Sequence, residues 1–271
     1  MPKPNFSESQ LQIAVNSAIM QYVFDTFGKQ ILANVPSLNA ERYLGWDSAF
    51  YFPWFPYVRA AEHEGCNFFI QYKLSKLLTT KSAKHWHYWD AEHFRFEIPY
   101  RTKEGDRFFD DYHQWELLKM LANNGYPTFY VTNDTHSKNE LFNKYENGTL
   151  LKTTPMLDVR DIHNKHKYIT FTNTSNYFLL HSQKEEIKKL FFSDALKIID
   201  ETQAINLKEA NKFLLKTLRA INEKDSFWQN ELIQISELHI SSEPHGEWMK
   251  RSLLAAFIRK HIGAEMLWLS V

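Results

Sequence analysis

The sequence contains a single cysteine, Cys66, among its 271 residues. One thiol excludes an intrachain disulfide framework and any cysteine-rich zinc site. Glycine is also scarce, at 8 residues, and no glycine-rich phosphate loop is present, which counts against a nucleotide-binding enzyme.

Charge of one sign and long apolar runs are lacking as well. The formal net charge is zero, which does not favour a dedicated nucleic-acid binder, although the local distribution of charge decides binding. No apolar run approaches the roughly 20 residues that span a bilayer, and residues 1–5 lack the apolar stretch of a signal peptide. We therefore expect no membrane contact and a cytoplasmic location.

Aromatic residues are plentiful, at 15% of the chain, while the charged share of 24% is ordinary for a globular protein. A chain of this length can form one large domain or a core with an appended part. The sequence thus has the means to bury a substantial core.

The first half of the chain alternates between helical and extended patterns. Ser7 and Gln10 have the spacing of a capping box before a helix expected over residues 7–33, in which Gly28 is a candidate end or bend. Further patterns predict a strand or hairpin, two strands, a helix and a strand, over residues 41–52, 67–74, 94–100, 110–123 and 128–132. This order favours an α/β or α+β sheet with helices on its faces.

The pattern changes beyond about residue 150. Two strands joined at residues 173–176 are expected within 167–180, followed by helices near 184–202, 207–222, 226–238 and 245–262. We therefore divide the chain into a core of residues 1–183 and a mainly helical region of residues 184–271 packed on it. One continuous domain is the alternative.

Two short polar motifs end apolar segments and suggest chemistry. The first is Gly45-Trp46-Asp47 and the second is Gln71-Tyr72-Lys73. Alternate side chains of a strand share a face, so Gln71 and Lys73 point the same way. A neighbouring strand carrying Asp47 would gather a carboxylate, a neutral oxygen ligand and an ammonium group, a set suited to metal-assisted cleavage of a phosphodiester.

These motifs, with the helix before them and the helix and strand after them, resemble the PD-(D/E)XK, or restriction-endonuclease-like, nuclease superfamily over roughly residues 7–133. The resemblance implies a mixed sheet flanked by helices in the order αβββαβ. It also implies Mg²⁺ (or Mn²⁺) bound by Asp47, with Gln71 at the second-ligand position and Lys73 as the catalytic lysine. The glutamine variant is similar to Mrr-like restriction enzymes.

The site needs a second carboxylate, because Gln71 is neutral and Mg²⁺ usually relies on one or two carboxylates. Glu41 lies on the same approach as Asp47, and Glu8 stands near the start of the first helix, where many members of the superfamily carry an acid. The alternatives remain open: Asp47 as a turn residue, Glu8 as a helix-dipole residue, Glu41 paired with a cation, and Gln71 and Lys73 on the solvent face of a strand.

The resemblance implies a nuclease acting on DNA, with a role in restriction or anti-phage defence and a homodimer or a defence complex as its assembly. A catalytically degenerate protein of the same fold, serving as a scaffold or DNA-binding subunit, is the main alternative. An unrelated α/β protein that binds a small ligand is a third.

The residues that follow the second motif are basic and aromatic. Lys76, Lys81 and Lys84 precede Trp86, Tyr88 and Trp89, so cations that meet phosphates stand beside rings that stack on bases. A solvated loop with core aromatics is the competing interpretation. A zinc site is a further one, with His85 and His87 on one face of a strand and His93 or Asp90 completing the set.

Overall fold

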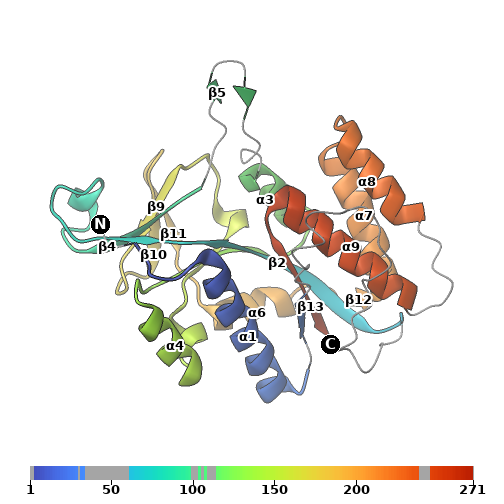
Figure 1. Ribbon diagram of the computed structural model, residues 1–271, viewed down its shortest axis with the longest axis horizontal. Coiled ribbons are helices and arrows are strands. Elements are labelled where there is room, and N and C mark those ends of the chain that lie inside the picture. The colour runs from blue at the N-terminus through green and yellow to red at the C-terminus, as the bar shows by residue number, and fades with distance from the viewer. Residues whose placement is uncertain are drawn as a thin grey trace.

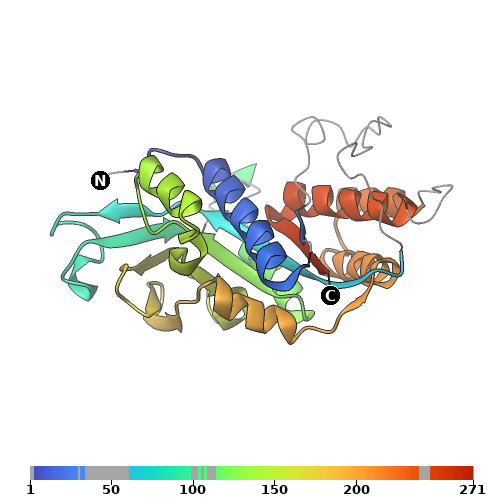
Figure 2. The ribbon, with the colours of Figure 1, turned by 90° about the horizontal axis from the view of Figure 1, so that it is seen from below.

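The computed structural model describes residues 3–29, 31–33, 61–98, 103–104, 107–108, 114–237 and 245–270. Its described strands form a larger sheet and a second sheet beside it, with helices against both faces of the larger one (Figures 1 and 2). The expected α/β class with a mixed sheet is confirmed.

Helix α1 (Glu8–Phe27) begins as its sequence predicts. The Ser7 side chain accepts from the backbone N–H of Gln10, and the Gln10 side chain accepts from the backbone N–H of Ser7, which completes the capping box. The helix ends earlier than expected, because Gly28 adopts the left-handed conformation with φ 64°. Strand β1 (Ile31–Ala33) follows within the range predicted as helix.

The larger sheet has the strand order β1-β13-β2-β7-β8, with β12 also paired to β2. Strands β2 and β7 are parallel and are joined through α3, whereas β13 and β8 run antiparallel to their neighbours. The bounds are β2 Glu64–Lys73, α3 Gln114–Asn123, β7 Thr128–Thr132, β8 Met156–Asp158, β12 Ile205–Asn206 and β13 Glu265–Ser270.

Strand β2 is buried on both faces, and its alternation separates two layers. Phe68, Ile70 and Tyr72 pack in the cluster that contains α1, while Phe69 packs in the cluster that contains α3 and α9. The strand predicted over residues 67–74 is therefore confirmed, and it lies at the centre of the fold with Gln71 and Lys73 near its carboxyl end.

The second sheet has the strand order β11-β10-β9-β4-β3. Only two residues separate the end of β2 from the start of β3. Its inner face, with Phe94, Phe96, Phe171 and Phe178, joins the same core as α3 and α9. The pair of strands predicted over residues 167–180 is confirmed. The bounds are β3 Lys76–Leu78, β4 His93–Glu97, β9 Tyr168–Phe171, β10 Tyr177–Leu180 and β11 Glu185–Lys188.

The later helices are α4 Lys138–Glu146, α5 Leu150–Thr153, α6 Phe192–Asp200, α7 Leu207–Ile221, α8 Ser226–Glu237 and α9 His245–Ile262. The short elements are the 3₁₀ turns η1 Trp86–Tyr88 and η3 Val159–Asp161 and the paired strands β5 Lys103–Glu104 and β6 Arg107–Phe108. Helices α7, α8 and α9 match their predictions closely. The helix predicted near 184–202 was wrong in its first part, because β11 pairs with β10 and buries Ile187 in the core, and α6 starts only at Phe192.

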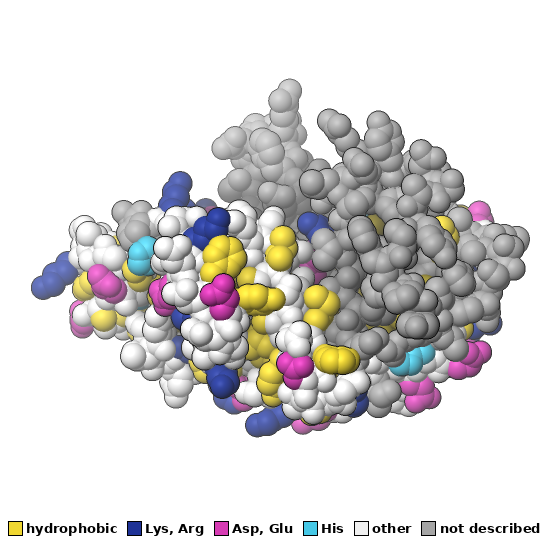
Figure 3. All heavy atoms as spheres, turned by 60° about the horizontal axis from the view of Figure 1, so that its bottom comes forward, with side chains coloured by type: hydrophobic (Ala, Val, Ile, Leu, Met, Phe, Trp, Pro, Cys, Tyr) yellow, Lys and Arg dark blue, Asp and Glu magenta, His cyan; other side chains and the backbone are white. Residues whose placement is uncertain are grey.

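The described helices include no membrane span, but α1 exposes apolar side chains. No helix within the described residues is both long and apolar enough to cross a membrane. Large apolar side chains are nevertheless exposed on α1, namely Ile13, Tyr22, Phe24 and Phe27. Figure 3 shows hydrophobic side chains gathered in one region of the surface that it views.

Candidate functional site

The carboxyl ends of the parallel strands β2 and β7 lie side by side, with Lys73 in register with Thr132. Just beyond them, the Asn133 side chain accepts from the backbone N–H of Ser75 at 2.7 Å and donates to the Ser75 carbonyl at 3.0 Å. The hydroxyls of Ser75 and Thr132 are 2.6 Å apart, and Ser75, Thr132 and Asn133 are all buried. This polar layer fixes the two strand ends in place beside the candidate lysine.

Helix α1 brings Glu8 to the same place. Partial burial raises the pKa of the Glu8 carboxyl, against the opposing influence of the Lys73 ammonium and of a hydrogen bond from the backbone of Leu74. Two candidates that are far apart in sequence, Glu8 and Lys73, are therefore neighbours at the carboxyl end of β2.

Gln71 lies on the same strand but is buried, at 4% exposure. Its amide nitrogen donates to the Tyr72 carbonyl, and its oxygen accepts from Gln114 Nε2, both at 2.9 Å. Gly263 makes this pairing possible, because a Cβ there would lie 2.5 Å from Gln114 Nε2 and 3.2 Å from Gln71 Oε1. The structure thus ties Gln71 to α3 and leaves its oxygen one remaining lone pair.

The described residues alone do not form a magnesium shell. No group of three or more His, Cys, Asp or Glu side chains within them is arranged to hold a metal ion. Asp47 and Glu41 lie outside the described residues. Glu8 comes from α1, whereas Gln71 is bonded to α3 on the other face of β2. These two donors are also fewer than the octahedral shell of Mg²⁺ requires, so the fit of the metal depends on Asp47 and Glu41.

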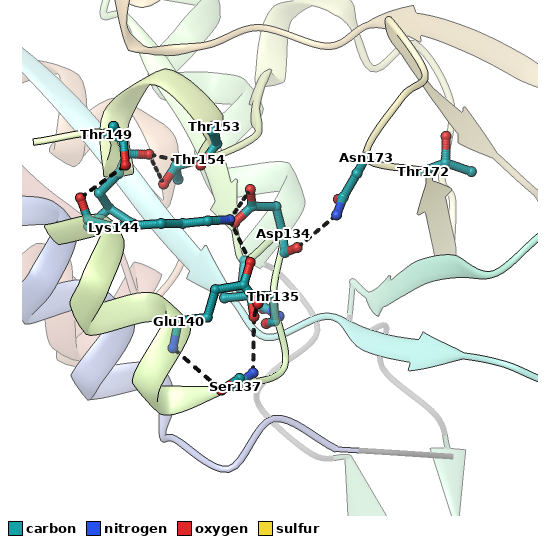
Figure 4. Close-up of polar contacts among 12 residues, drawn as sticks. Asp134, Thr135, Ser137, Glu140, Lys144, Thr149, Thr153, Thr154, Thr172 and Asn173 are labelled. Carbon is teal, nitrogen blue, oxygen red and sulfur yellow. Dashed lines mark hydrogen bonds and ion pairs between the residues drawn. The ribbon is translucent and has the colours of Figure 1, made fainter. Parts of the chain in front are cut away.

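A second polar network follows β7 and was missed from the sequence (Figure 4). Lys144 Nζ lies 2.7 Å from the Asp134 carboxylate and 3.2 Å from that of Glu140, and the Thr135 hydroxyl donates to Glu140 at 2.5 Å. Asn173 donates to the Asp134 carbonyl at 3.1 Å, which links the turn between β9 and β10 to the segment before α4. The run of polar residues directly after the buried strand, from Asn133 to Thr135, is the signal that could have located it.

Lys144 contacts both carboxylates, so their charges are already compensated within the protein. The network therefore joins α4 to the segment after β7 and to the turn between β9 and β10, rather than binding a ligand. Burial opposes ionisation of Glu140, but hydrogen bonds from Thr135 and Lys144 outweigh it and lower the pKa of the carboxyl. The buried Lys189 ammonium lies nearby and donates to the carbonyls of Thr172 and Asn173.

The three lysines predicted to bind nucleic acid follow the candidate strand onto the second sheet. Lys76 is on β3 in register with Arg95, and Lys81 and Lys84 are exposed in the segment that leads to η1. Lys84 Nζ lies 4.6 Å from the ring centroid of Tyr168. Sequence reasoning missed Arg95, Lys167 and Tyr168, which the pairing of β4 with β9 brings to the same place.

The histidines considered for zinc form an aromatic cluster instead. Residues 86–88 are a 3₁₀ turn, so His85 and His87 do not alternate along a strand. His85 stacks on His181 with ring centroids 3.7 Å apart, and His181 Nε2 lies 2.7 Å from the Thr170 hydroxyl. Burial is the main cause that lowers the pKa of His85 to about 4 and that of His181 to about 3, with nearby Lys84 and Arg95 adding to the shift of His85.

These shifts predict a loss of stability in acid. The ordinary pKa of a histidine side chain is 6.5. Well above this pH both residues are neutral in the folded and unfolded states, and the protein has the full stability that their contacts provide. Below pH 6.5 the two histidines bind protons in the unfolded chain, whereas in the folded protein they bind protons only as the pH approaches 4 to 3. The free energy of unfolding therefore falls as the pH is lowered through this range. We expect a loss of about 1 to 3 kcal/mol from this pair, after allowance for solvent screening.

Urea denaturation at a series of pH values measures this loss. His181→Gln keeps a hydrogen-bonding group beside Thr170 but does not titrate, so its free energy of unfolding should depend less on pH than that of the wild type. His163→Gln, at an exposed histidine, is the matched control. Identical pH profiles for the wild type and His181→Gln would contradict the assignment.

The candidate site therefore offers an ammonium group and a carboxylate above a rigid polar layer, with a cationic aromatic surface a few residues along the chain. Such groups can hold a phosphate and orient a water molecule against it. No protein-family model, curated protein or solved structure matches this chain, so its own geometry carries the functional argument.

Proposed function

We propose that this protein is a metal-dependent nuclease that hydrolyses DNA phosphodiester bonds, with a role in restriction or anti-phage defence. The observation that carries the proposal is the position of Glu8 beside Lys73 at the carboxyl end of β2, two residues beyond Gln71. The restriction-endonuclease-like core is part of the same proposal. It is supported by the order of α1, β2, α3 and β7 along the chain, with β3 and β4 of the second sheet inserted between β2 and α3.

In this proposal the Lys73 ammonium binds a phosphate oxygen and stabilises the charge that develops there. Glu8 accepts a proton from, or orients, the attacking water, a role that suits a carboxyl with a raised pKa. A bound Mg²⁺ or Mn²⁺ would polarise the phosphate and acidify the water. Asp47 and Glu41, together with Glu8 and Gln71, are the residues proposed to bind this metal. The roles of Lys73 and Glu8 described here do not depend on a step carried out by the metal.

A cleavage assay tests the proposal directly. Single-stranded and duplex DNA should be cut in Mg²⁺ or Mn²⁺ and left intact in EDTA. Calorimetric titration of Mn²⁺ should show binding to the wild type that Asp47→Ala loses. A folded wild-type protein that neither cuts DNA with either metal nor binds Mn²⁺ would refute the proposal.

A catalytically degenerate scaffold is the second candidate. The amide nitrogen and oxygen of Gln71 are both engaged within the protein, and Ile13, Phe24 and Phe27 expose an apolar surface on α1 that suits contact with a partner or a second copy. This candidate predicts the negative outcome of the same assay, so one experiment separates the two.

A further inference from the structure

Three cations from separate segments surround one aromatic ring on the outer face of the second sheet. Lys84 Nζ, Arg95 Cζ and Lys167 Nζ lie 4.6, 5.0 and 5.5 Å from the ring centroid of Tyr168. Within the described residues, Glu97 is the carboxylate paired with this group, 3.3 Å from Lys167. Three cations against one paired carboxylate give the described part of this group an excess of positive charge, so it favours an anionic ligand.

An aromatic surface lies next to these cations. Tyr88 is 39% exposed, and its ring centroid lies 4.0 Å from that of His87 and 5.0 Å from that of His181. Lys184 Nζ stands 5.9 Å from the Tyr88 ring. An exposed ring that packs against two histidine rings and lies beside an ammonium group is suited to stacking with a nucleobase.

The loop that carries Lys84 and Tyr88 is held firmly on the sheet. Trp89 Nε1 donates to the Thr170 hydroxyl at 2.8 Å, and the Trp89 ring stacks on Tyr177 with centroids 5.2 Å apart. His85 adopts a left-handed backbone with φ 72°, an unusual conformation for a residue other than glycine. The loop backbone that carries Lys84 and Tyr88 is thereby positioned before any ligand arrives, which lowers the entropic cost of binding.

We propose that this surface binds single-stranded nucleic acid, with phosphates on Lys84, Arg95 and Lys167 and a base stacked on Tyr88. A duplex hides the faces of its bases, whereas a single strand exposes them. Lys76, in register with Arg95, extends the surface toward the candidate site, since three residues of extended chain from Lys73 span at most about 10 Å.

The inference deepens the proposed nuclease function and rests on it for the choice of nucleic acid as the ligand class. Binding measured in EDTA separates the two. Retained binding without metal-dependent cleavage would refute the nuclease function alone, and cleavage by a protein that does not bind through this surface would refute this inference alone.

The experiment is fluorescence anisotropy in EDTA with a labelled DNA strand of about 20 nucleotides, longer than a typical single-strand site, and with the duplex of the same sequence. We expect tighter binding of the single strand. The variant Lys84→Gln, Arg95→Gln, Lys167→Gln should reduce the slope of log affinity against log salt by about 2, because each lost phosphate contact removes about 0.7. Tyr88→Ala should weaken binding about 5- to 100-fold at constant salt.

The control variant removes the same number of charges from the helical side of the molecule, away from the second sheet (Figure 1). It carries Lys212→Gln, Lys216→Gln and Lys224→Gln, all at exposed positions on or after α7, and should keep the wild-type slope. An unchanged slope in the first variant, unchanged affinity in Tyr88→Ala, or equal or tighter binding of the duplex would each overturn the inference.

Discussion

Lys73→Ala is expected to reduce metal-dependent cleavage of DNA by about 100- to 1000-fold, the loss that follows removal of one group that stabilises transition-state charge. Lys73 is the last residue of β2 and is only half-buried, so its truncation should leave the core intact. Lys73→Arg retains the positive charge without the compact ammonium and should keep an intermediate rate. The measurement is the single-turnover rate with saturating enzyme, which separates chemistry from binding.

Two companion variants sharpen this result. Glu8→Gln removes the neighbouring charge and should flatten the acid side of the pH–rate profile, because the carboxyl whose pKa is raised no longer titrates. Lys197→Ala, at an exposed lysine on α6, controls for the loss of one charge. A Lys73→Ala protein that cleaves at the wild-type rate would show that Lys73 has no part in catalysis.

The elements with strong local signals were predictable from the sequence. The capping box at Ser7, the β2 segment and the helical periodicity of α7 to α9 all appear where expected, because caps and amphipathic faces depend on nearby residues. Strand β13 was missed even though β2, which is also buried on both faces, was predicted from its length and aromatic content. A continuous apolar run of this kind lacks the alternation that identifies a strand.

The surroundings of the candidate site depend on contacts that no local pattern encodes. Sequence placed Gln71 and Lys73 on one strand, but the approach of Glu8 follows from how α1 packs across the sheet. The cluster around Tyr168 likewise requires β4 to pair with β9, a pairing between segments about seventy residues apart along the chain. Such long-range pairings are set by the whole fold, so only the first member of the cluster, Lys84, was identified.

Trp268, on β13, is fully buried and tightly packed in the described core. Its ring covers Gly65 so closely that a Cβ on Gly65 would lie 2.5 Å from ring atom Cε2. The guanidinium of Arg251, a fully buried side chain of α9, lies 4.3 Å from the ring centroid. Arg251 donates to the Asn67 side chain, but its Nε and Nη1 have no hydrogen-bond partner in the described part of the chain.

This guanidinium remains charged in the interior. Burial lowers the pKa of Arg251 to about 9, which still leaves it protonated at neutral pH. The π face of Trp268 stabilises this buried cation, and the attraction is strongest where water is excluded.

Trp268→Ala is therefore expected to lower the free energy of unfolding by about 3 to 5 kcal/mol from cavity formation alone, with about 2 kcal/mol more from the lost contact with Arg251. Urea denaturation measures the change, and Trp268→Phe should cost much less because it keeps a ring. Arg251→Met removes the buried cation. This change should cost little stability, because an apolar side chain of similar volume can replace a buried charge.

A double-mutant cycle over Trp268→Ala and Arg251→Met isolates the contact between the two residues. We expect the double mutant to be more stable than the sum of the single effects allows, by about 1 to 2 kcal/mol. Strict additivity would mean that the ring does not stabilise the guanidinium, which among the described residues would leave the hydrogen bond to Asn67 as its support.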